Sequence, residues 1–256
     1  MKVFNNYSKY YDLLYKDKNY NEEANFIHTI ISQNSSSTKK IFEMGCGTGL
    51  HAIALAQKGY SINGIDFSNE MLKIAEKRLL KTSKTISSKL SFFYGDVRKF
   101  DSQQKYDTVI SLFHICSYMT TNDDLHDYFE TARKHLNKGG IFIFDCWYGP
   151  TVLTDRPTIR VKQIEDENIK VTRTATPEMF PNKNLVNVNY NILVTDKKTK
   201  RTEKMKETHV MRYLFQPEIE MFLKNSGFEL LSSQEWLSGK TLGFDTWSAC
   251  FVAKLI

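Results

Sequence analysis

Short apolar runs alternate with amphipathic segments through the first half of the chain, a pattern typical of a parallel sheet with crossover helices. The runs predict strands at residues 40–44, 60–65, 90–94, 107–112 and 141–146. Between them, amphipathic spacing predicts helices near 49–58, 69–82 and 122–136, and "NKGG" (137–140) is expected to end the last of these. Residues 1–31 carry aromatic and apolar side chains at helical spacing, so a largely helical start is expected, followed by a polar linker at 32–40.

The pattern changes after Pro150. Four antiparallel strands, separated by polar turns such as "TDKKTKR", are expected at 158–164, 169–176, 185–195 and 203–214. "QPEIEMFLKNSG" then predicts a helix, and "FELLSSQEW" and "DTWSACFVAKLI" predict two last strands. The sequence therefore predicts an α/β fold with a doubly wound, mostly parallel seven-stranded sheet and an antiparallel β insertion after the fifth strand. The expected parts are 1–150, 151–214 and 215–256.

Composition narrows the class of protein. With 256 residues, 41% of them hydrophobic, the chain can bury a full-sized core. It has no apolar run near the roughly 20 residues that a membrane span needs, and its start lacks the apolar stretch of a signal peptide. The cysteines lack CxxC spacing, which argues against a zinc site or a disulfide framework and favours the cytoplasm: Cys46, Cys116, Cys146 and Cys250.

The net charge of +6 is concentrated in one segment, because residues 155–213 hold 13 Lys and Arg against 8 Asp and Glu. This segment is either a solvated lysine-rich surface or a cap that attracts a phosphate-bearing substrate. No basic stripe interleaved with aromatic residues is present, so a nucleic-acid partner is not expected.

Three glycines in "FEMGCGTGL" (42–50) follow the first predicted strand. A glycine turn between a strand and a helix lets a ligand approach the backbone, and the helix N-terminus favours anionic groups. The spacing Gly45, Gly47, Gly49 differs from the dinucleotide pattern G-x-G-x-x-G, which would need a glycine at Leu50, and no Gly-Lys-Ser/Thr follows. An oxidoreductase acting with a dinucleotide is therefore disfavoured.

An acidic residue opens this motif. "E-x-G-x-G-x-G" suits a ligand with an amino-acid end, because backbone donors can meet a carboxylate while Glu43 reaches an ammonium group, directly or through water. The alternative is a glycine turn that serves helix–strand packing alone.

Two further segments suggest a nucleoside. Asp66 ends the second predicted strand, where a carboxylate can accept hydrogen bonds from ribose hydroxyls, and Phe67 and Met71 would flank an adenine ring. Asp66 could instead cap the next helix, although Ser68 already offers that role. In "FFYGDVRKF", Asp96 can accept from the adenine amino group with the Val97 amide nearby, although "GD" alone is also a turn signal.

With these three segments in order, residues 40–146 resemble a class I S-adenosylmethionine-dependent methyltransferase. The resemblance implies a Rossmann-like methyltransferase fold and S-adenosyl-L-methionine as the cofactor, with its methionyl end at the glycine turn. Methyl transfer from a sulfonium needs alignment of the reacting atoms and exclusion of water. A neutral amine attacks without prior proton loss, whereas a hydroxyl needs a base.

The segment "SLFHICSYM" lies where the acceptor is expected. His114 is the candidate base, unless it is a buried histidine satisfied by the backbone. Tyr118 orients the acceptor or simply packs. Asp145 ends the fifth strand at the same rim and could hold an amine or hydroxyl, or cap the following turn.

The N-terminal "YYDLLYKDKNYNEEA" is similar to the start of methyltransferases that act on nucleotide-linked amino sugars, in which a tyrosine-bearing helix closes over the cofactor. Tyr11, near the transfer, and Tyr20, at the cofactor, occupy the matching places, unless they form an aromatic core face. The similarity extends over nearly the whole chain and is looser after residue 150. "FHICSYM" departs from the small-residue run of those enzymes, so N- and O-methylation both stay open.

Specificity is expected in the insertion. "WYGP" (147–150) offers an aromatic wall, and Arg156 and Arg160 offer guanidinium groups suited to phosphate. His209 and Arg212 stand three apart on one expected strand, so one of them alone can line the pocket.

These observations together predict a cytoplasmic methyltransferase for a small phosphate-bearing acceptor, a nucleotide-linked (amino) sugar of surface-glycan (polysaccharide) or secondary metabolism. Residues 1–150 would form a lid helix and the cofactor domain, 151–214 a substrate cap, and 215–256 the last part of the sheet. The alternatives are O-methylation of a sugar, phosphate or phosphate-derived substituent, or a non-catalytic S-adenosylmethionine-binding protein. A homodimer is left open.

Overall fold

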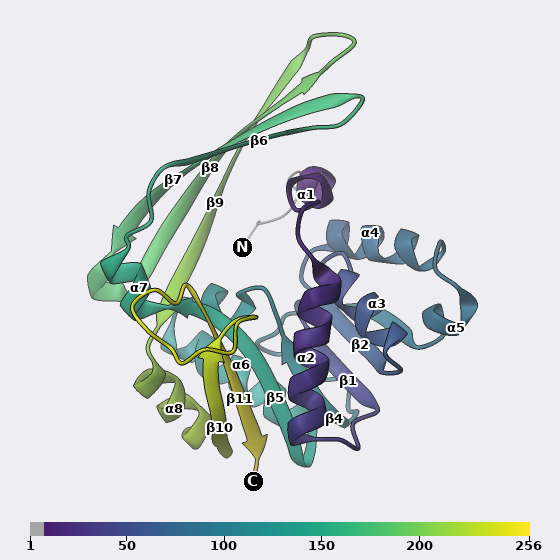
Figure 1. Cartoon of the computed structure of the whole chain (residues 1–256), viewed down its shortest axis with the longest axis vertical. Helices are drawn as coiled ribbons and strands as arrows, with labels where there is room; N and C mark the ends of the chain where they lie inside the picture. The colour runs from purple at the N-terminus through teal and green to yellow at the C-terminus, as the bar shows by residue number, and fades with distance from the viewer. Residues whose placement is uncertain (1–7) are drawn as a thin grey trace.

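A computed structural model describes residues 8–256, and its central layer is a seven-stranded sheet in the order β3-β2-β1-β4-β5-β11-β10 (Figure 1). Strands β1 to β5 run parallel to one another, whereas β11 runs antiparallel to both β5 and β10. The strands are β1 (Lys40–Met44), β2 (Ser61–Asp66), β3 (Leu90–Tyr94), β4 (Tyr106–Ser111), β5 (Leu136–Tyr148), β10 (Phe228–Glu235) and β11 (Ser248–Leu255). The predicted fold class is confirmed.

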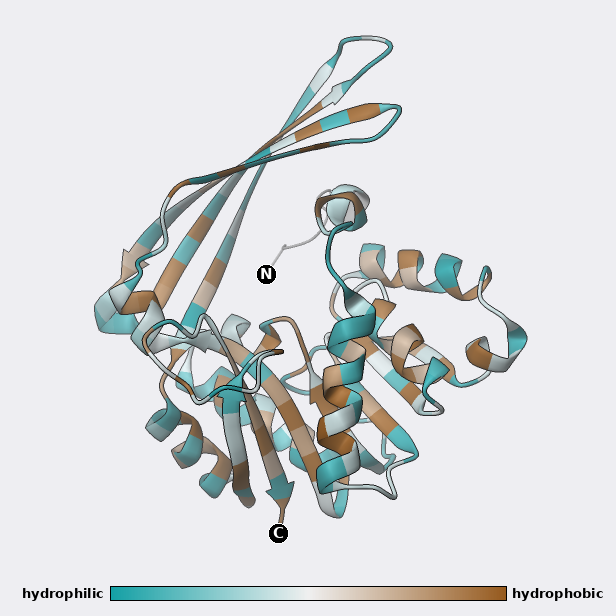
Figure 2. Cartoon of the chain, in the orientation of Figure 1, coloured by the Kyte–Doolittle hydropathy of each residue, from teal (hydrophilic) through white to brown (hydrophobic). Residues whose placement is uncertain are grey.

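Helices cover both faces of this sheet, as its apolar strands require. Helices α2 (Tyr20–Asn34) and α3 (Leu50–Gln57) pack on one face, and α6 (Asn122–His135) and α8 (Gln216–Asn225) pack on the other. Helix α4 (Asn69–Leu79) packs against β2 and β3 and is followed by the short α5 (Lys84–Ser87). Figure 2 shows the resulting band of hydrophobic residues along the central strands and the inner side of α2.

The insertion forms a second, antiparallel sheet in the order β9-β8-β7-β6. Its elements are α7 (Gly149–Thr154), β6 (Arg160–Glu165), β7 (Ile169–Phe180), η2 (Pro181–Lys183), β8 (Leu185–Asp196) and β9 (Thr202–Leu214). The last residues of β9 pair in parallel with the end of β5, Trp147 with Tyr213 and Tyr148 with Leu214. The insertion sheet therefore grows from the carboxyl end of β5 and rises over that edge of the central layer (Figure 1).

The N-terminal helix α1 (Ser8–Leu14) joins the insertion sheet to the central domain. Leu14 is fully buried against apolar residues on the inner face of the insertion sheet, namely Ile164, Val171, Ile192 and Val194. On the opposite side, the Asp12 carboxylate accepts a hydrogen bond from the Thr48 hydroxyl (3.1 Å) and pairs with Arg78 of α4 (2.6 Å). These contacts hold α1 above the glycine turn that follows β1.

Two local predictions were wrong. Helix α6 ends at His135 and β5 begins at Leu136, so "NKGG" lies inside the strand, where Leu136 already pairs with Tyr106 of β4. The N-terminal helical region is broken at residues 15–19, and α2 continues to Asn34, into the predicted linker. The first part of the predicted helical start, residues 1–7, lies outside the described residues. Within residues 8–256, no helix is both long and apolar enough to cross a membrane.

Candidate functional site

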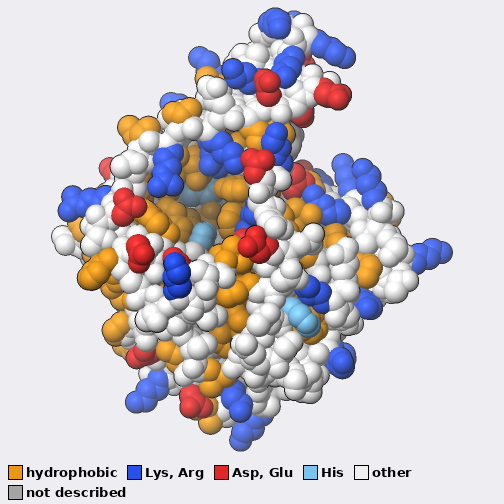
Figure 3. Space-filling model, in the orientation of Figure 1, with side chains coloured by type: hydrophobic (Ala, Val, Ile, Leu, Met, Phe, Trp, Pro, Cys, Tyr) orange, Lys and Arg blue, Asp and Glu red, His pale blue; other side chains and the backbone are white. Residues whose placement is uncertain are grey.

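Two adjoining cavities lie at the carboxyl ends of β1, β2 and β4, the usual ligand position in an open α/β sheet. The inner cavity is enclosed by the glycine turn, the N-terminal tyrosines and the inner face of the insertion sheet. The outer cavity lies beside the start of α4 and the segment after β3. Both share Gly45, Asp66, Ile115 and Tyr118. Figure 3 shows the hollow beneath the insertion sheet, with hydrophobic and histidine side chains in its depth and Lys and Arg on its rim.

Glycine is favoured in this turn for two physical reasons, the backbone conformation and the lack of space for a side chain. Gly45, Gly47 and Gly49 all adopt left-handed backbone conformations, with φ of +82°, +53° and +76°. A Cβ on Gly45 would lie 2.5 Å from Cδ1 of Ile115, and one on Gly49 would lie 2.7 Å from Cζ of Phe92. A Cβ on Gly47 would meet no atom within 4 Å, so its backbone conformation alone favours glycine there. The turn therefore leaves its backbone open to the inner cavity.

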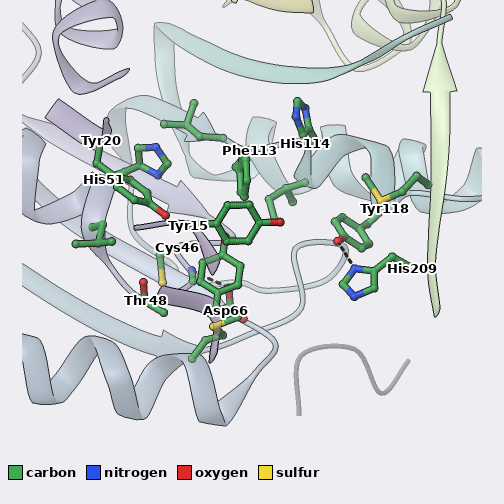
Figure 4. Close-up of a pocket in the computed structure, with 18 of the residues that line it drawn as sticks. Tyr15, Tyr20, Cys46, Thr48, His51, Asp66, Phe113, His114, Tyr118 and His209 are labelled. Atoms are coloured by element: carbon green, nitrogen blue, oxygen red, sulfur yellow. Dashed lines mark hydrogen bonds between the residues drawn. The ribbon is translucent and has the colours of Figure 1, made fainter. Parts of the chain in front are cut away.

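Asp66, at the end of β2, lines both cavities and braces the glycine turn (Figure 4). Its carboxylate accepts hydrogen bonds from the Gly47 and Ser68 amides, each at 2.8 Å. Burial raises the pKa of Asp66, and these amide hydrogen bonds act in the opposite direction. Ser68 is the N-cap of α4, since its hydroxyl accepts from the Met71 amide at 3.2 Å. Asp66 is thus not needed as the helix cap.

Glu43 lies on β1 behind the turn. It is 1% exposed and lines neither cavity, and its contact with a ligand ammonium, directly or through water, stays a prediction. Burial and the nearby Asp66 raise the pKa of Glu43 to about 8, and its Oε2 has no hydrogen-bond partner among the described residues. A cationic ligand at the turn would favour the ionised form of this carboxyl group.

The raised pKa of Glu43 predicts a pH-dependent effect of Glu43→Gln on stability. The folded protein holds the Glu43 proton up to pH of about 8, whereas the unfolded chain releases it near 4.5. Wild type therefore loses stability relative to the variant as pH rises from about 5 to 8, because the neutral amide needs no proton. We expect the melting temperature of Glu43→Gln, minus that of wild type, to increase steadily over this range.

The exposed Glu229→Gln serves as the control and should show a constant difference. If the difference in melting temperature between Glu43→Gln and wild type were also constant between pH 5 and 8, it would contradict a buried, protonated carboxyl group. Thermal unfolding without cofactor, in buffers of matched ionic strength, makes the measurement.

The outer cavity contains Asp96, Val97 and Phe67, as predicted, and also Arg98, which the sequence analysis missed. Arg98 binds Asp96 with both Nε (2.9 Å) and Nη2 (2.6 Å), and its Nη1 reaches Asp124 at 2.7 Å. The Arg98 hydrogen bonds outweigh burial and lower the pKa of Asp96. Asp96 is therefore held as a carboxylate, with its position fixed by Arg98.

The predicted pair of Phe67 and Met71 is divided between the two adjoining cavities, and their place on either side of an adenine ring stays a prediction. Phe67 lines the outer cavity and is 46% exposed, whereas Met71 is buried and lines the inner cavity. Phe67 precedes the N-cap residue of α4, whereas Met71 lies in the first turn of that helix, where its amide donates to Ser68. Ile115 and Met119 provide apolar side chains in the outer cavity.

His114 is held by an unusual stretch of backbone. Phe113 and His114 have φ of +65° and +66°, left-handed conformations that non-glycine residues rarely adopt. The buried Asp145 carboxylate accepts from the His114 amide (3.0 and 3.1 Å) and from the Ser248 hydroxyl (3.2 Å). Its Oδ2 also lies 2.7 Å from Nδ1 of His114, although the two atoms are poorly aligned for a hydrogen bond. Asp145 therefore positions both the backbone and the ring of His114 at the inner cavity.

Tyrosines from the start of the chain line the same cavity. Tyr11 and Tyr20 do so as predicted, and Tyr15, which was missed, lies between them in sequence. The Tyr15 ring meets Phe113 edge-on at 5.2 Å, and Tyr20 meets His51 edge-on at 4.9 Å. Figure 4 shows Tyr15 and Tyr20 beside the glycine turn.

The insertion contributes His209, with Val188, Tyr190 and Met211, to the inner cavity. Arg212 faces the other way and is buried, pairing with Glu218 and donating to Asn122 at 2.8 Å. The prediction that one of these two alone lines the pocket is confirmed. Arg156 and Arg160 are exposed and line neither cavity. Trp147 of "WYGP" lines the inner cavity as expected, while Gly149 and Pro150 begin α7.

The sheet order, the glycine turn and the acidic residue that ends β2 agree with the predicted Rossmann-like methyltransferase fold, and residues 41–140 match the family described as "Methyltransferase domain". The predicted resemblance and the predicted cofactor class are confirmed by this match and by the similarities that follow.

The chain is 27% identical, over 147 residues, to a dTDP-3-amino-3,4,6-trideoxy-α-D-glucopyranose N,N-dimethyltransferase from Streptomyces venezuelae; this covers 57% of the chain and 59% of the relative. It is 26% identical over 231 residues to the putative methyltransferase YqeM of Bacillus subtilis (strain 168), covering 89% and 87%. Among solved structures, an S-adenosylmethionine-dependent methyltransferase from Clostridium acetobutylicum ATCC 824 aligns with a TM-score of 0.80 and 24% identity, over 98% and 99% of the two chains.

Proposed function

We propose that this chain transfers a methyl group from S-adenosylmethionine to the amino group of a small, nucleotide-linked sugar. The observation that carries the proposal is the pair of joined cavities: one holds the nucleoside-binding residues, and the other is roofed by the insertion sheet. The similarity to an amino-sugar N,N-dimethyltransferase supports the acceptor class.

The residues present suit the proposed cofactor. The bare backbone of the glycine turn and Asp66 would hold its methionyl and ribose parts, and Asp96 and Val97 its adenine, in the outer cavity. Asp66 lines both cavities and Glu43 is buried behind the turn, and a cationic ligand there would favour the ionised form of both carboxyl groups. When bound, the cofactor supplies an activated methyl group, so the protein's own residues align the acceptor and exclude water.

We further propose that α1 is a lid and residues 151–214 a substrate cap, with residues 215–256 completing the central sheet. The packing of Leu14 under the insertion sheet and the pairing of Asp12 with Arg78 support a closed arrangement of both over the inner cavity. Tyr11 of the lid and Tyr118 would surround the acceptor.

The phosphate-bearing part of the acceptor would extend toward Arg160. This guanidinium lies 6.0 Å above the ring of Trp247, which meets Trp147 of the inner cavity edge-on at 6.1 Å. An exposed arginine on an aromatic surface next to the sugar site suits a diphosphate.

A panel of nucleotide-linked sugars, with and without an amino group, tests the proposed function. The purified chain is incubated with S-adenosylmethionine and each sugar, and S-adenosylhomocysteine and methylated product are measured by mass spectrometry. Methylation of amino sugars alone supports the proposal. Cofactor binding without turnover of any acceptor would instead favour the non-catalytic binding protein.

His114 beside Asp145 favours a second candidate, O-methylation, because a carboxylate next to Nδ1 leaves Nε2 as a base. The variant His114→Ala separates the two. For an amine acceptor we expect kcat to fall by less than about tenfold, whereas loss of a required base costs about 100- to 10,000-fold.

The exposed His126→Ala provides the control for this measurement, which is made at saturating cofactor and acceptor. A fall of 100-fold or more in His114→Ala alone would overturn N-methylation in favour of O-methylation.

We retain the cytoplasm as the proposed location, since all four cysteines are buried free thiols. A homodimer stays a prediction.

A further inference from the structure

The hydroxyl group of Tyr118 and the imidazole of His209 meet at the wall of the inner cavity. Tyr118 ends the short helix η1 (Ile115–Tyr118), and His209 lies on β9 of the insertion sheet. Nδ1 of His209 and the Tyr118 oxygen are 2.7 Å apart, shown by the dashed line in Figure 4. Tyr118 lines both cavities, so this hydrogen bond joins the cofactor side of the site to the acceptor side.

The surroundings of His209 determine which atom carries the proton. Tyr190 of β8 meets its ring edge-on at 5.0 Å, and Arg173 of β7 lies 4.8 Å from the Tyr190 ring. Glu207, on the same strand, is 3.8 Å from Nε2. Burial, with a smaller contribution from Arg173, lowers the pKa of His209 to about 4, and burial raises the pKa of Tyr118 well above its usual range. Both groups are therefore neutral at pH 7, and Glu207 beside Nε2 favours the histidine tautomer that carries its proton on Nε2, in which the phenol donates and Nδ1 accepts.

A phenol that donates its proton in this way presents its oxygen as a hydrogen-bond acceptor. An amine that attacks a methyl group must direct its lone pair at the carbon and its N–H groups elsewhere. An oxygen at the acceptor cavity that receives one N–H fixes that orientation, which is the main contribution a methyltransferase has to make.

We propose that His209 is a positioning residue that holds the Tyr118 oxygen as the hydrogen-bond acceptor for an N–H group of the incoming amine. This rests on the proposed function, because it assigns the amine a partner at the same site. It also separates the two histidines of the cavity: His114, beside Asp145, is placed to receive a proton, whereas His209 stays neutral and acts through Tyr118.

Three variants test the role of the pair in turnover. His209→Asn places an amide oxygen near the position of Nδ1, His209→Leu removes the acceptor, and Tyr118→Phe removes the donor. We expect His209→Leu and Tyr118→Phe each to lower kcat by about tenfold, which is the contribution of one oriented hydrogen bond. The Kd for S-adenosylmethionine should not change. The variant His209→Asn should keep most of the wild-type kcat. The double variant should be no slower than either single variant, because both remove one interaction.

Equal kcat values for His209→Leu, His209→Asn and wild type would overturn the inference. Additive losses of kcat in the double variant of His209→Leu and Tyr118→Phe would also overturn it. A merely structural role predicts a lower melting temperature in His209→Leu without this pattern of rescue and non-additivity.

A spectroscopic measurement decides the geometry without an acceptor. In protein with ¹⁵N-labelled histidine, His209, assigned with His209→Asn, should show an unprotonated Nδ1 and a protonated Nε2 throughout pH 5.5–8. Tyr118→Phe should shift the Nδ1 resonance. An imidazolium or the opposite tautomer at pH 7 would overturn the inference. The expected tautomer, with no turnover of any amine by wild type, would instead contradict the proposed function and with it the amine partner.

Discussion

Gly45→Ala is expected to weaken the binding of S-adenosylmethionine by roughly 100-fold while leaving a folded protein. The new Cβ would lie 2.5 Å from Cδ1 of Ile115, and the backbone at φ +82° is one that alanine avoids at a cost of about 1–2 kcal/mol. Ile115 begins η1 and lines both cavities, so its displacement would move the wall on which Tyr118 stands. A combined penalty of about 3 kcal/mol on the binding-competent arrangement weakens binding by roughly 100-fold. Calorimetric titration with the cofactor makes the measurement.

Variants at two other glycines distinguish the effect of backbone strain from that of a steric clash. Gly47 (φ +53°) and Gly227 (φ +75°) also have left-handed backbones, but a Cβ at either position would meet no atom within 4 Å. Gly227→Ala, beyond α8, should lower the melting temperature and leave cofactor affinity intact. Gly47→Ala should weaken binding less than Gly45→Ala does. Wild-type affinity in Gly45→Ala would show that the turn and η1 do not act together in the site.

The central domain was predictable because its signals are local. Each buried strand is a short apolar run, and the glycine turn and Asp66 follow two of these runs directly, so sequence order placed them at one edge of the sheet. The insertion strands were predictable for the same reason.

The parts of the site that were missed depend on contacts distant in sequence. Asp12 meets Arg78 66 residues away, and Tyr118 meets His209 91 residues away. The hydrophobic periodicity of the sequence carries no information about such distant pairs. Tyr15 and Tyr190 were overlooked because an aromatic side chain on an amphipathic helix or strand is usually predicted to pack in the hydrophobic core. Arg98 could have been found, since it follows Asp96 by two residues in "GDVR".

Glu43 shows that the position of a motif residue is easier to predict from sequence than the direction of its side chain. Its position before the glycines is local, but the direction of its side chain is set by the pleat of β1. In the structure the carboxyl group is buried and lines neither cavity.

Asp66→Asn is expected to weaken S-adenosylmethionine binding by at least about 100-fold. The carboxylate accepts from two backbone amides at once, through Oδ2 from Gly47 and through Oδ1 from Ser68. An asparagine can satisfy one of them, and its NH₂ group must then face the other N–H, so the turn or the start of α4 has to shift. The change also removes a buried negative charge beside a cationic ligand, and hydrogen bonds to a charged group are worth about 1.5–3 kcal/mol.

Asp107→Asn is a matched control at the opposite end of the sheet. The Asp107 Oδ2 also accepts from two consecutive backbone amides, those of Lys39 and Lys40, each at 2.9 Å, but far along β1 from either cavity. Both variants should lower the melting temperature, and Asp66→Asn alone should lose cofactor affinity. Similar destabilisation with wild-type affinity in both would mean that Asp66 merely braces the turn. Loss of affinity confined to Asp66→Asn would mean that the same carboxylate that fixes the backbone also holds the ligand, because both variants replace a carboxylate that accepts from backbone amides and only Asp66 lies at the cavities.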